Sequence, residues 1–168
     1  MGPRAAVTLD PADRRLLLVL SRDGRRSAAA LAKDLGLSRQ AVAQRLKALE
    51  RRGVIRGYRA VVEPAALGLL VRAQIRLAVD GAAPREREKD LLRRLSANPL
   101  VRSVYRVSGE DCFVAQVQCR RIEDVNALLA DLKKSRAIQS SRTAFVLETL
   151  VDKGGLGPVE GALLTEED

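Results

Sequence analysis

The most restrictive feature of this sequence is the order of its hydrophobic patterns between residues 71 and 151. In residues 71–79 apolar and polar side chains alternate strictly, which predicts a strand with one buried face. The full series is strand 71–79, helix 83–96, strand 100–107, strand 112–119, helix 122–134 and strand 142–151. The order βαββαβ predicts a ferredoxin-like domain, a four-stranded antiparallel sheet with both helices on one face. We expect a second copy of the chain to cover the other face.

Three consecutive helices are predicted in the first third of the chain, because each has a capping residue at its start. Aspartate and serine accept hydrogen bonds from the first backbone N–H groups of a helix, and glycine often follows its last turn. The candidate caps are Asp10 or Asp13, Ser27 and Ser38, and the helices that follow them extend to about Ser21, Leu35 and Arg52. We expect these helices to pack through apolar residues at helical spacing.

The second and third helices are joined by a short turn. Gly36 supplies the positive φ that a sharp turn requires, and one residue separates it from the next cap, Ser38. Two short helices joined in this way form a helix-turn-helix motif, which we place at about residues 28–47. The extended run 54–62 is predicted to be a wing strand. The predicted fold class is therefore α+β, with an N-terminal winged helix-turn-helix domain before the C-terminal ferredoxin-like domain.

The excess of positive charge lies entirely in the first part of the chain. Residues 1–60 contain 14 basic and 5 acidic residues, a net charge of +9, whereas residues 61–168 contain 16 of each. Such an uneven distribution is typical of a module that binds a polyanion joined to a neutral module with another role. With two tyrosines, two phenylalanines and no tryptophan, the chain lacks a stacking platform for single strands, so duplex DNA is favoured.

The predicted third helix carries side chains suited to reading base edges. Arginine pairs with guanine, glutamine with adenine, and a small residue can contact a thymine methyl group. The DNA-binding candidates are Arg25, Arg26, Ser38, Arg39, Gln40, Ala43, Gln44, Lys47, Arg51 and Arg52. Arg39 and Gln44 are the preferred base readers, and the arginines that flank the helices are placed against phosphates. An isolated charged helix face is more often only solvated, but the concentration of charge, the two caps and the glycine turn favour DNA here.

Missing residue types exclude several classes of function. The sequence has no histidine, which removes Ser-His and Cys-His nucleophiles and most zinc sites, so we expect no enzyme, metal or cofactor. Cys112 and Cys119 lie in one predicted strand with their side chains on opposite faces, so we expect free thiols of a reducing compartment. No apolar run approaches the ~18 residues of a membrane span, and the first residues lack the core of a signal peptide. We expect a soluble cytoplasmic protein with no membrane partner.

Four motifs in a fixed order resemble the leucine-responsive regulatory protein / asparagine-operon regulator (Lrp/AsnC) family over about residues 9–152. They are Leu9-Asp10-x-x-Asp13, the run from Leu31 to Ser38, Arg45-x-x-x-Leu49-Glu50-x-x-Gly53-Val-Ile55-x-Gly57-Tyr58, and Val107-x-Gly109-Glu-Asp-Cys-Phe113. The resemblance implies a DNA-binding domain, a hinge and a ligand-sensing domain. It also implies dimers that assemble into octamers or related rings, with small effectors, usually amino acids, bound between dimers.

The resemblance places an effector motif at the turn of Gly109, Glu110 and Asp111. Cys112 stands where the commoner Gly-x-x-Asp form has its aspartate, so either Asp111 takes that role from a shifted position or the ligand differs. A glycine turn can direct N–H groups at a ligand carboxylate, and an acidic side chain can pair with an ammonium group. Ser140, Ser141 and Thr143 are candidate hydroxyl donors at the start of the last strand. A solvated turn has the same composition, so it is the resemblance that favours a ligand.

The predicted organisation has four parts. Residues 1–62 are the DNA-binding domain, 63–70 the hinge, 71–152 the effector-binding and oligomerisation domain, and 153–168 a tail. The predicted function is a sequence-specific, DNA-binding transcriptional regulator that responds to an amino acid or similar effector. One alternative is an architectural DNA-binding protein without an effector. A second is the amino-acid-sensing module of an enzyme, against which stand the absent histidines and the lack of a phosphate-binding glycine loop.

Overall fold

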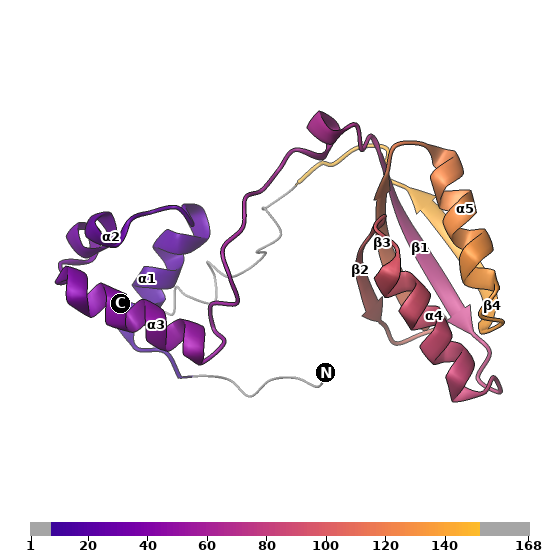
Figure 1. Cartoon of the computed structure of the whole chain (residues 1–168), viewed down its shortest axis with the longest axis horizontal. Coiled ribbons are helices and arrows are strands. Elements are labelled where there is room, and N and C mark those ends of the chain that lie inside the picture. The colour runs from indigo at the N-terminus through magenta and orange to yellow at the C-terminus, as the bar shows by residue number, and fades with distance from the viewer. Residues whose placement is uncertain (1–7, 152–168) are drawn as a thin grey trace. The chain divides into compact units, whose positions relative to one another are not determined.

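A computed structural model of the protein describes residues 8–151 (Figure 1). The contacts within the chain form two compact units that divide between Val61 and Val62. The predicted tail at 153–168 lies outside the described residues. Within residues 8–151, no helix combines the length and the apolar character needed to cross a membrane.

The N-terminal unit consists of three helices: α1 (Pro11–Arg22), α2 (Ala28–Leu35) and α3 (Arg39–Arg51). Each begins at a side-chain cap, because Asp10, Ser27 and Ser38 accept hydrogen bonds from backbone N–H groups three residues later. Of the two caps proposed for α1, the structure therefore uses Asp10. The core consists of side chains from all three helices, with Leu16, Leu31, Val42 and Leu49 fully buried. Burial of each stabilises the unit by roughly 1.5–3 kcal/mol.

Gly36 makes the turn between α2 and α3 with a φ of 65°. That left-handed conformation is unfavourable for residues with a Cβ atom, so a glycine suits the position. The turn is closed by Leu37, whose N–H donates to the carbonyl of Ala32 at 2.9 Å. The predicted helix-turn-helix arrangement of α2 and α3 is thus present.

The wing strand predicted for residues 54–62 is wrong: this segment forms no strand in the structure. Val54 and Ile55 pack against the helical core, and their N–H groups donate to the carbonyl of Leu49 at 2.9 and 3.2 Å. Residues 56–62 are exposed. The apolar residues at the start of the run therefore complete the core instead of pairing with another strand. The predicted hinge contains a short 3-10 helix, η1 (Pro64–Leu67), which ends at Gly68 with a φ of 73°.

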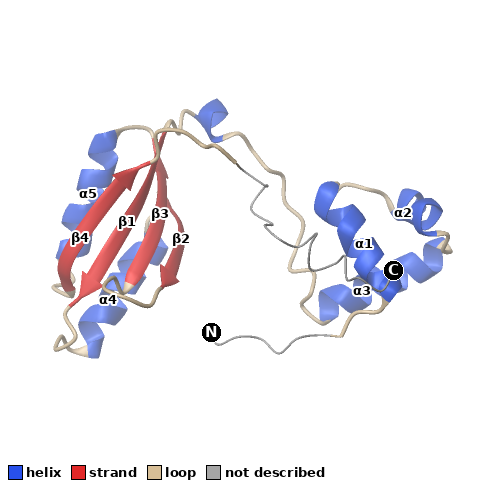
Figure 2. Cartoon of the chain, turned by 180° about the vertical axis from the view of Figure 1, so that it is seen from behind, coloured by secondary structure: helices blue, strands red, loops and turns tan. Residues whose placement is uncertain are grey.

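The C-terminal unit is a four-stranded sheet with two helices. Its elements are β1 (Val71–Val79), α4 (Arg85–Ala97), β2 (Val101–Arg106), β3 (Phe113–Cys119), α5 (Ile122–Lys133) and β4 (Ile138–Phe145). The strands lie in the order β2-β3-β1-β4, and every neighbouring pair is antiparallel. Figure 2 shows α4 and α5 on the same face of the sheet, so the predicted ferredoxin-like arrangement is confirmed.

The core of this unit lies between the sheet and the two helices. Ala73, Ile75 and Leu77 of β1 are buried on the helix-covered face, as their alternation predicts. Their register partners on β3 are Val117, Ala115 and Phe113, which are buried too. The helices contribute Leu91, Leu95, Val125, Leu128 and Leu132. Arg72, Gln74 and Arg76 lie on the opposite face, which neither helix covers. We call this face the open face.

The last strand differs most from its predicted bounds of 142–151. It begins four residues earlier, where Ile138 pairs with Val79 after a turn at Arg136. It ends at Phe145 because its antiparallel partner β1 begins at Val71; the last link is the N–H of Val146 to the carbonyl of Arg72 at 2.9 Å. The apolar residues beyond this point have no strand to pair with and are exposed. The other predicted elements agree to within two residues.

Candidate DNA-binding surface and effector turn

Helix α3 has two opposite faces. Val42 and Leu49 are fully buried. Four exposed polar side chains recur at intervals of four, three and four residues, and so lie on the other side of the helix: Gln40, Gln44, Lys47 and Arg51. We call these four residues the α3 stripe. It combines two amides and two cations, groups that can hydrogen-bond base edges and phosphates.

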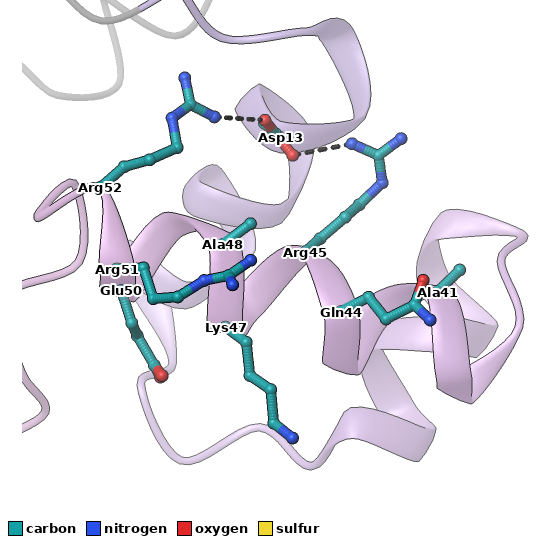
Figure 3. A pocket seen from close by; sticks show the side chains of 9 residues that line it. All are labelled: Asp13, Ala41, Gln44, Arg45, Lys47, Ala48, Glu50, Arg51 and Arg52. Atoms are coloured by element: carbon teal, nitrogen blue, oxygen red, sulfur yellow. Dashed lines mark hydrogen bonds and ion pairs between the residues drawn. The ribbon is translucent and has the colours of Figure 1, made fainter.

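A shallow groove of about 870 Å³ runs along α3 beside this stripe (Figure 3). Its lining is Asp13, Ala41, Gln44, Arg45, Lys47, Ala48, Glu50, Arg51 and Arg52. Four of the predicted DNA-binding residues, Gln44, Lys47, Arg51 and Arg52, are thus brought together. The small side chains of Ala41 and Ala48 line the groove between the longer ones.

Asp13 divides the arginines of α3 into two kinds. Its buried carboxylate pairs with Arg45 at 2.8 Å and with Arg52 at 3.5 Å, one on each oxygen (Figure 3). Arg45 also donates to Asp10 at 2.5 Å, and this hydrogen bond lowers the pKa of the Asp10 carboxyl. Arg45 and Arg52 therefore hold α1 against α3, whereas Arg51 has no such carboxylate contact among the residues described.

The remaining predicted DNA-binding residues lie at the start of α3 and before α2. Ser38 caps α3 through a hydrogen bond from Ala41, and Arg39 is exposed beside it. Ala43 is half-buried. Arg26 pairs with Asp34 at 2.5 Å, and this contact lowers the pKa of that carboxyl. Arg25 is exposed in the same loop.

The predicted effector turn links β2 and β3 and contains Gly109, whose φ is 104°. At its base, the N–H of Val107 donates to the carbonyl of Cys112 at 3.1 Å. Two exposed arginines of neighbouring strands contact its acidic side chains. Arg142 of β4 lies 3.2 Å from Glu110 and 3.4 Å from Asp111, and Arg76 of β1 lies 3.9 Å from the other oxygen of Asp111. The contact with Glu110 is the largest cause of a raised pKa at Arg142.

Cys112 and Asp111 point in different directions. The thiol of Cys112 accepts a hydrogen bond from the N–H of Val79 at 3.4 Å, so this side chain turns toward β1. Asp111 reaches Arg76 and Arg142 on the open face. Asp111, the residue considered as a substitute for the usual aspartate, thus reaches the charged side chains of the sheet.

The three hydroxyl residues proposed for the effector site do not lie together. Ser141 pairs with Leu77 and Thr143 pairs with Ile75, which places both on the helix-covered face. Ser140 pairs with Ala78 and lies on the open face together with Arg142. Sequence analysis missed Arg76 and Arg142, because only the register of β1, β4 and the turn brings them together. The pairing of Arg45 with Asp13 was not predicted either, because it joins two helices.

Cation-binding residues are not clustered in this part of the chain. Over residues 8–151, no group of three or more cysteine, aspartate or glutamate residues is arranged to hold a metal ion. Both cysteines are free, and burial raises the pKa of the Cys119 thiol.

Two family models match the chain. Residues 9–56 match a winged helix-turn-helix DNA-binding model, and residues 72–156 match the Lrp/AsnC ligand binding domain. Together they span the three helices and the sheet unit. The resemblance inferred from the four sequence motifs is confirmed.

Known proteins that are similar to this chain are transcriptional regulators. The HTH-type transcriptional regulator LrpA of Mycobacterium tuberculosis is 34% identical over 142 residues, covering 84% of this chain and 91% of LrpA. The regulator AldR of Mycolicibacterium smegmatis is 32% identical over 143 residues, covering 84% and 83%. A transcriptional regulator of Neisseria meningitidis, solved as a complex with L-Met, has a TM-score of 0.82 and 27% identity, covering 90% of this chain and 97% of that one. This chain belongs to the Lrp/AsnC family of HTH-type transcriptional regulators.

Proposed function

We propose that this regulator binds duplex DNA sequence-specifically through the α3 stripe. The observation that carries the proposal is that Gln40, Gln44, Lys47 and Arg51 are exposed on the side of α3 opposite its buried leucine and valine. A helix that is fixed by its apolar face and capped at Ser38 can enter a major groove with these side chains directed at the DNA. The net charge of +9 in residues 1–60 supports the phosphate contacts.

The contacts divide between bases and phosphates. Arg39 and Gln44 are the proposed base readers, because they lie in the N-terminal half of α3, the part that contacts base edges in helix-turn-helix proteins. Gln40, Ala43 and Lys47 complete the surface around them. Arg51 at the end of α3 and Arg25 before α2 are proposed to contact phosphates. Arg26 and Arg52, each already paired with a protein carboxylate, contribute less.

We propose that the regulator acts as a homodimer that assembles further, for example into an octamer. The open face of the sheet supports this, because neither helix covers it and it offers a flat surface on which the sheet of a second copy can pack. A two-fold dimer would place two recognition helices about 34–36 Å apart, so that they enter successive major grooves. Residues 1–62 would bind DNA, 63–70 act as a hinge and 71–152 hold the oligomer together.

We propose an amino acid as the effector, bound at the turn of Gly109, Glu110 and Asp111 between subunits. The match to a ligand binding domain and the L-Met complex of the Neisseria regulator support this. An effector can change DNA affinity only if it prefers one arrangement of the subunits.

The proposed location is the cytoplasm. The proposed role is regulation without enzymatic activity, and no metal or cofactor is required.

Selection of duplex sequences from a random library tests the DNA proposal. The full-length protein should enrich one motif, and its affinity for that motif should exceed its affinity for random duplex by about 10³-fold or more. Equal affinity for all duplexes would favour the architectural alternative. Titration of the twenty amino acids, with DNA affinity and oligomer size as readouts, then tests the effector.

A further inference from the structure

A basic segment without acidic residues lies at the end of helix α3 and continues beyond it. Residues 51–62 contain no aspartate or glutamate but four arginines: Arg51, Arg52, Arg56 and Arg59. The last two of these lie in the exposed run that forms no strand, and they were not among the predicted DNA-binding residues. We call residues 56–59 the basic arm.

The start of the basic arm is fixed to the end of α3. The chain turns at Gly53, whose φ is 68°. Val54 and Ile55 then pack against the helical core, and their N–H groups donate to the carbonyl of Leu49. The arm also belongs to the same compact unit as the three helices. Its first residue therefore leaves the helical core at a defined point beside α3.

A hydrogen bond holds the middle of the arm against the same helix. The hydroxyl of Tyr58 donates to Oε1 of Glu50 at 3.1 Å, and burial together with this bond raises the pKa of the Tyr58 hydroxyl. Glu50 lines the α3 groove together with Lys47 and Arg51. Glu50 and Lys47 extend from α3 toward the same side (Figure 3). The contact thus places the arm beside the C-terminal end of the α3 stripe.

The two arginines of the arm are unpaired within the part of the chain that the structure describes. Their Cα atoms lie within about 8 Å of the Cα atom of Tyr58, because consecutive Cα atoms are about 3.8 Å apart. Arg56 and Arg59 are exposed, and over residues 8–151 neither side chain makes a hydrogen bond or an ion pair. Arg52, by contrast, is paired with Asp13. A phosphate can therefore bind Arg56 and Arg59 without displacing a protein carboxylate.

Gly57 separates the two arginines and leaves the main chain uncovered. Its φ of 144° is strained for residues that have a Cβ atom, and nothing lies within 4 Å of the position that a Cβ would occupy. The space above this glycine is therefore open. A glycine in such a place allows the backbone of a partner to approach the main chain closely.

We propose that the basic arm is a second DNA contact, in which Arg56 and Arg59 bind phosphates of the duplex whose major groove α3 enters. Tyr58 and Glu50 are the positioning residues of the arm. The inference rests on the proposed DNA-binding function and adds a contact outside the helix-turn-helix motif. Phosphate contacts fix the orientation of a protein on DNA but carry no sequence information. The arm should thus strengthen binding to every duplex and leave the choice of sequence to α3.

The test measures binding of the full-length variant Arg56→Met/Arg59→Met to the selected motif and to random duplex. We expect a loss of about tenfold or more on both duplexes at 200 mM salt, and a slope of log affinity against log salt concentration that is smaller by about two. The matched control, Arg102→Met/Lys133→Met, removes the same charge from exposed positions of the sheet unit. Losses no larger than those of the control would overturn the proposal. Melting temperatures verify that each variant is folded.

A charge-preserving variant separates phosphate contacts from base contacts. Arg56→Lys/Arg59→Lys should retain most of the wild-type affinity, because lysine binds a phosphate as a point charge but lacks the planar fork of arginine. The ratio of affinities for the selected motif and random duplex should be the same as in the wild type. A lysine variant as weak as the methionine variant, or a loss confined to the selected motif, would overturn the assignment to phosphates.

Tyr58→Phe tests whether the hydrogen bond to Glu50 positions the arm. The variant removes only the hydroxyl and should weaken duplex binding by about threefold in the wild-type background. It should have no further effect in the Arg56→Met/Arg59→Met background, because it acts through those arginines. An equal effect in both backgrounds would show that Tyr58 does not act through the arm.

The outcomes distinguish this inference from the proposed function. Failure of the wild-type protein to bind duplex DNA would contradict both. Selection of a motif by the wild type, with the same affinity and salt slope in Arg56→Met/Arg59→Met, would contradict the inference alone. Equal wild-type affinity for all duplexes, with a smaller salt slope in the arm variant, would contradict sequence-specific binding and support the inference.

Discussion

The α3 stripe contains an exposed arginine, and two exposed arginines of neighbouring strands contact the effector turn, but the surroundings of these arginines differ. Around the stripe, Asp13 pairs with Arg45 and Arg52, which leaves Lys47 and Arg51 directed at solvent. At the turn, Arg142 and Arg76 are balanced by two carboxylates. The first arrangement suits a polyanion, and the second suits a small ligand that carries both charges. The number of arginines alone therefore does not indicate what a surface binds.

The largest expected difference between the two surfaces is their response to salt. DNA binding releases counterions, so raising the salt concentration from 50 to 200 mM should weaken duplex binding by about 10³-fold for about six phosphate contacts. The affinity for an amino acid should change by less than about threefold over the same range of salt, because its binding exchanges ion pairs within one site. Fluorescence anisotropy and calorimetry measure the two affinities. A similar salt dependence for both ligands would contradict the distinction between the two surfaces.

Asp13→Ala should cause the largest loss of stability among the charged residues of the N-terminal unit. It removes a buried carboxylate, which takes away the carboxylate partner of Arg52 and leaves Arg45 with Asp10 alone, at a cost of about 2–3 kcal/mol in the free energy of unfolding. The matched control is Asp34→Ala, which breaks an exposed pair with Arg26. Urea denaturation followed by circular dichroism measures both. A loss no larger than that of the control would show that Asp13 does not hold α1 and α3 together.

Gln44→Ala and Arg51→Ala should weaken DNA binding in different ways. Loss of Gln44 should cost ~1–3 kcal/mol at the selected motif and relax specificity at one base pair. Loss of Arg51 should weaken binding to all duplexes equally. It should also reduce the slope of log affinity against log salt concentration by about one. Binding to the selected motif and to random duplex at several salt concentrations measures both effects. Equal losses on both duplexes for Gln44→Ala would reassign Gln44 to a phosphate contact.

The smallest expected effect is on acid stability. The hydrogen bond from Arg45 lowers the pKa of Asp10 below the ordinary value of 3.8. This contact therefore stabilises the protein fully above that pH, and the contribution disappears as the pH falls through the lowered pKa. The unfolding free energy of Asp10→Asn should accordingly depend less on pH below about 4 than that of the wild type. Identical pH profiles for the two proteins would show that the contact between Arg45 and Asp10 is too exposed to contribute to stability.

Local patterns predicted most of the fold. The alternation of Val71 to Val79, the caps Ser27 and Ser38, and Gly36 each act within a few residues, so they can be interpreted without knowing the neighbours in space. The α3 stripe follows from the same helical spacing.

Features set by distant partners were not predicted. The end of β4 depends on where β1 begins, and the run after Ile55 lacks a strand to pair with, so its apolar residues were misleading. The contact of Asp13 with Arg45 joins residues 32 positions apart, and that of Asp111 with Arg142 joins residues 31 apart. No local pattern distinguishes these arginines from the ones that remain directed at solvent.

The most direct test of the central claim removes two cations from each unit and measures duplex binding. The double variant Lys47→Met/Arg51→Met neutralises the α3 stripe, and Arg102→Met/Lys133→Met removes the same charge from exposed positions of the sheet unit. We predict that the first variant binds the selected duplex at least tenfold more weakly than wild type and that the second changes affinity by less than about threefold. Equal losses in the two variants would contradict the assignment of α3 as the DNA-binding surface.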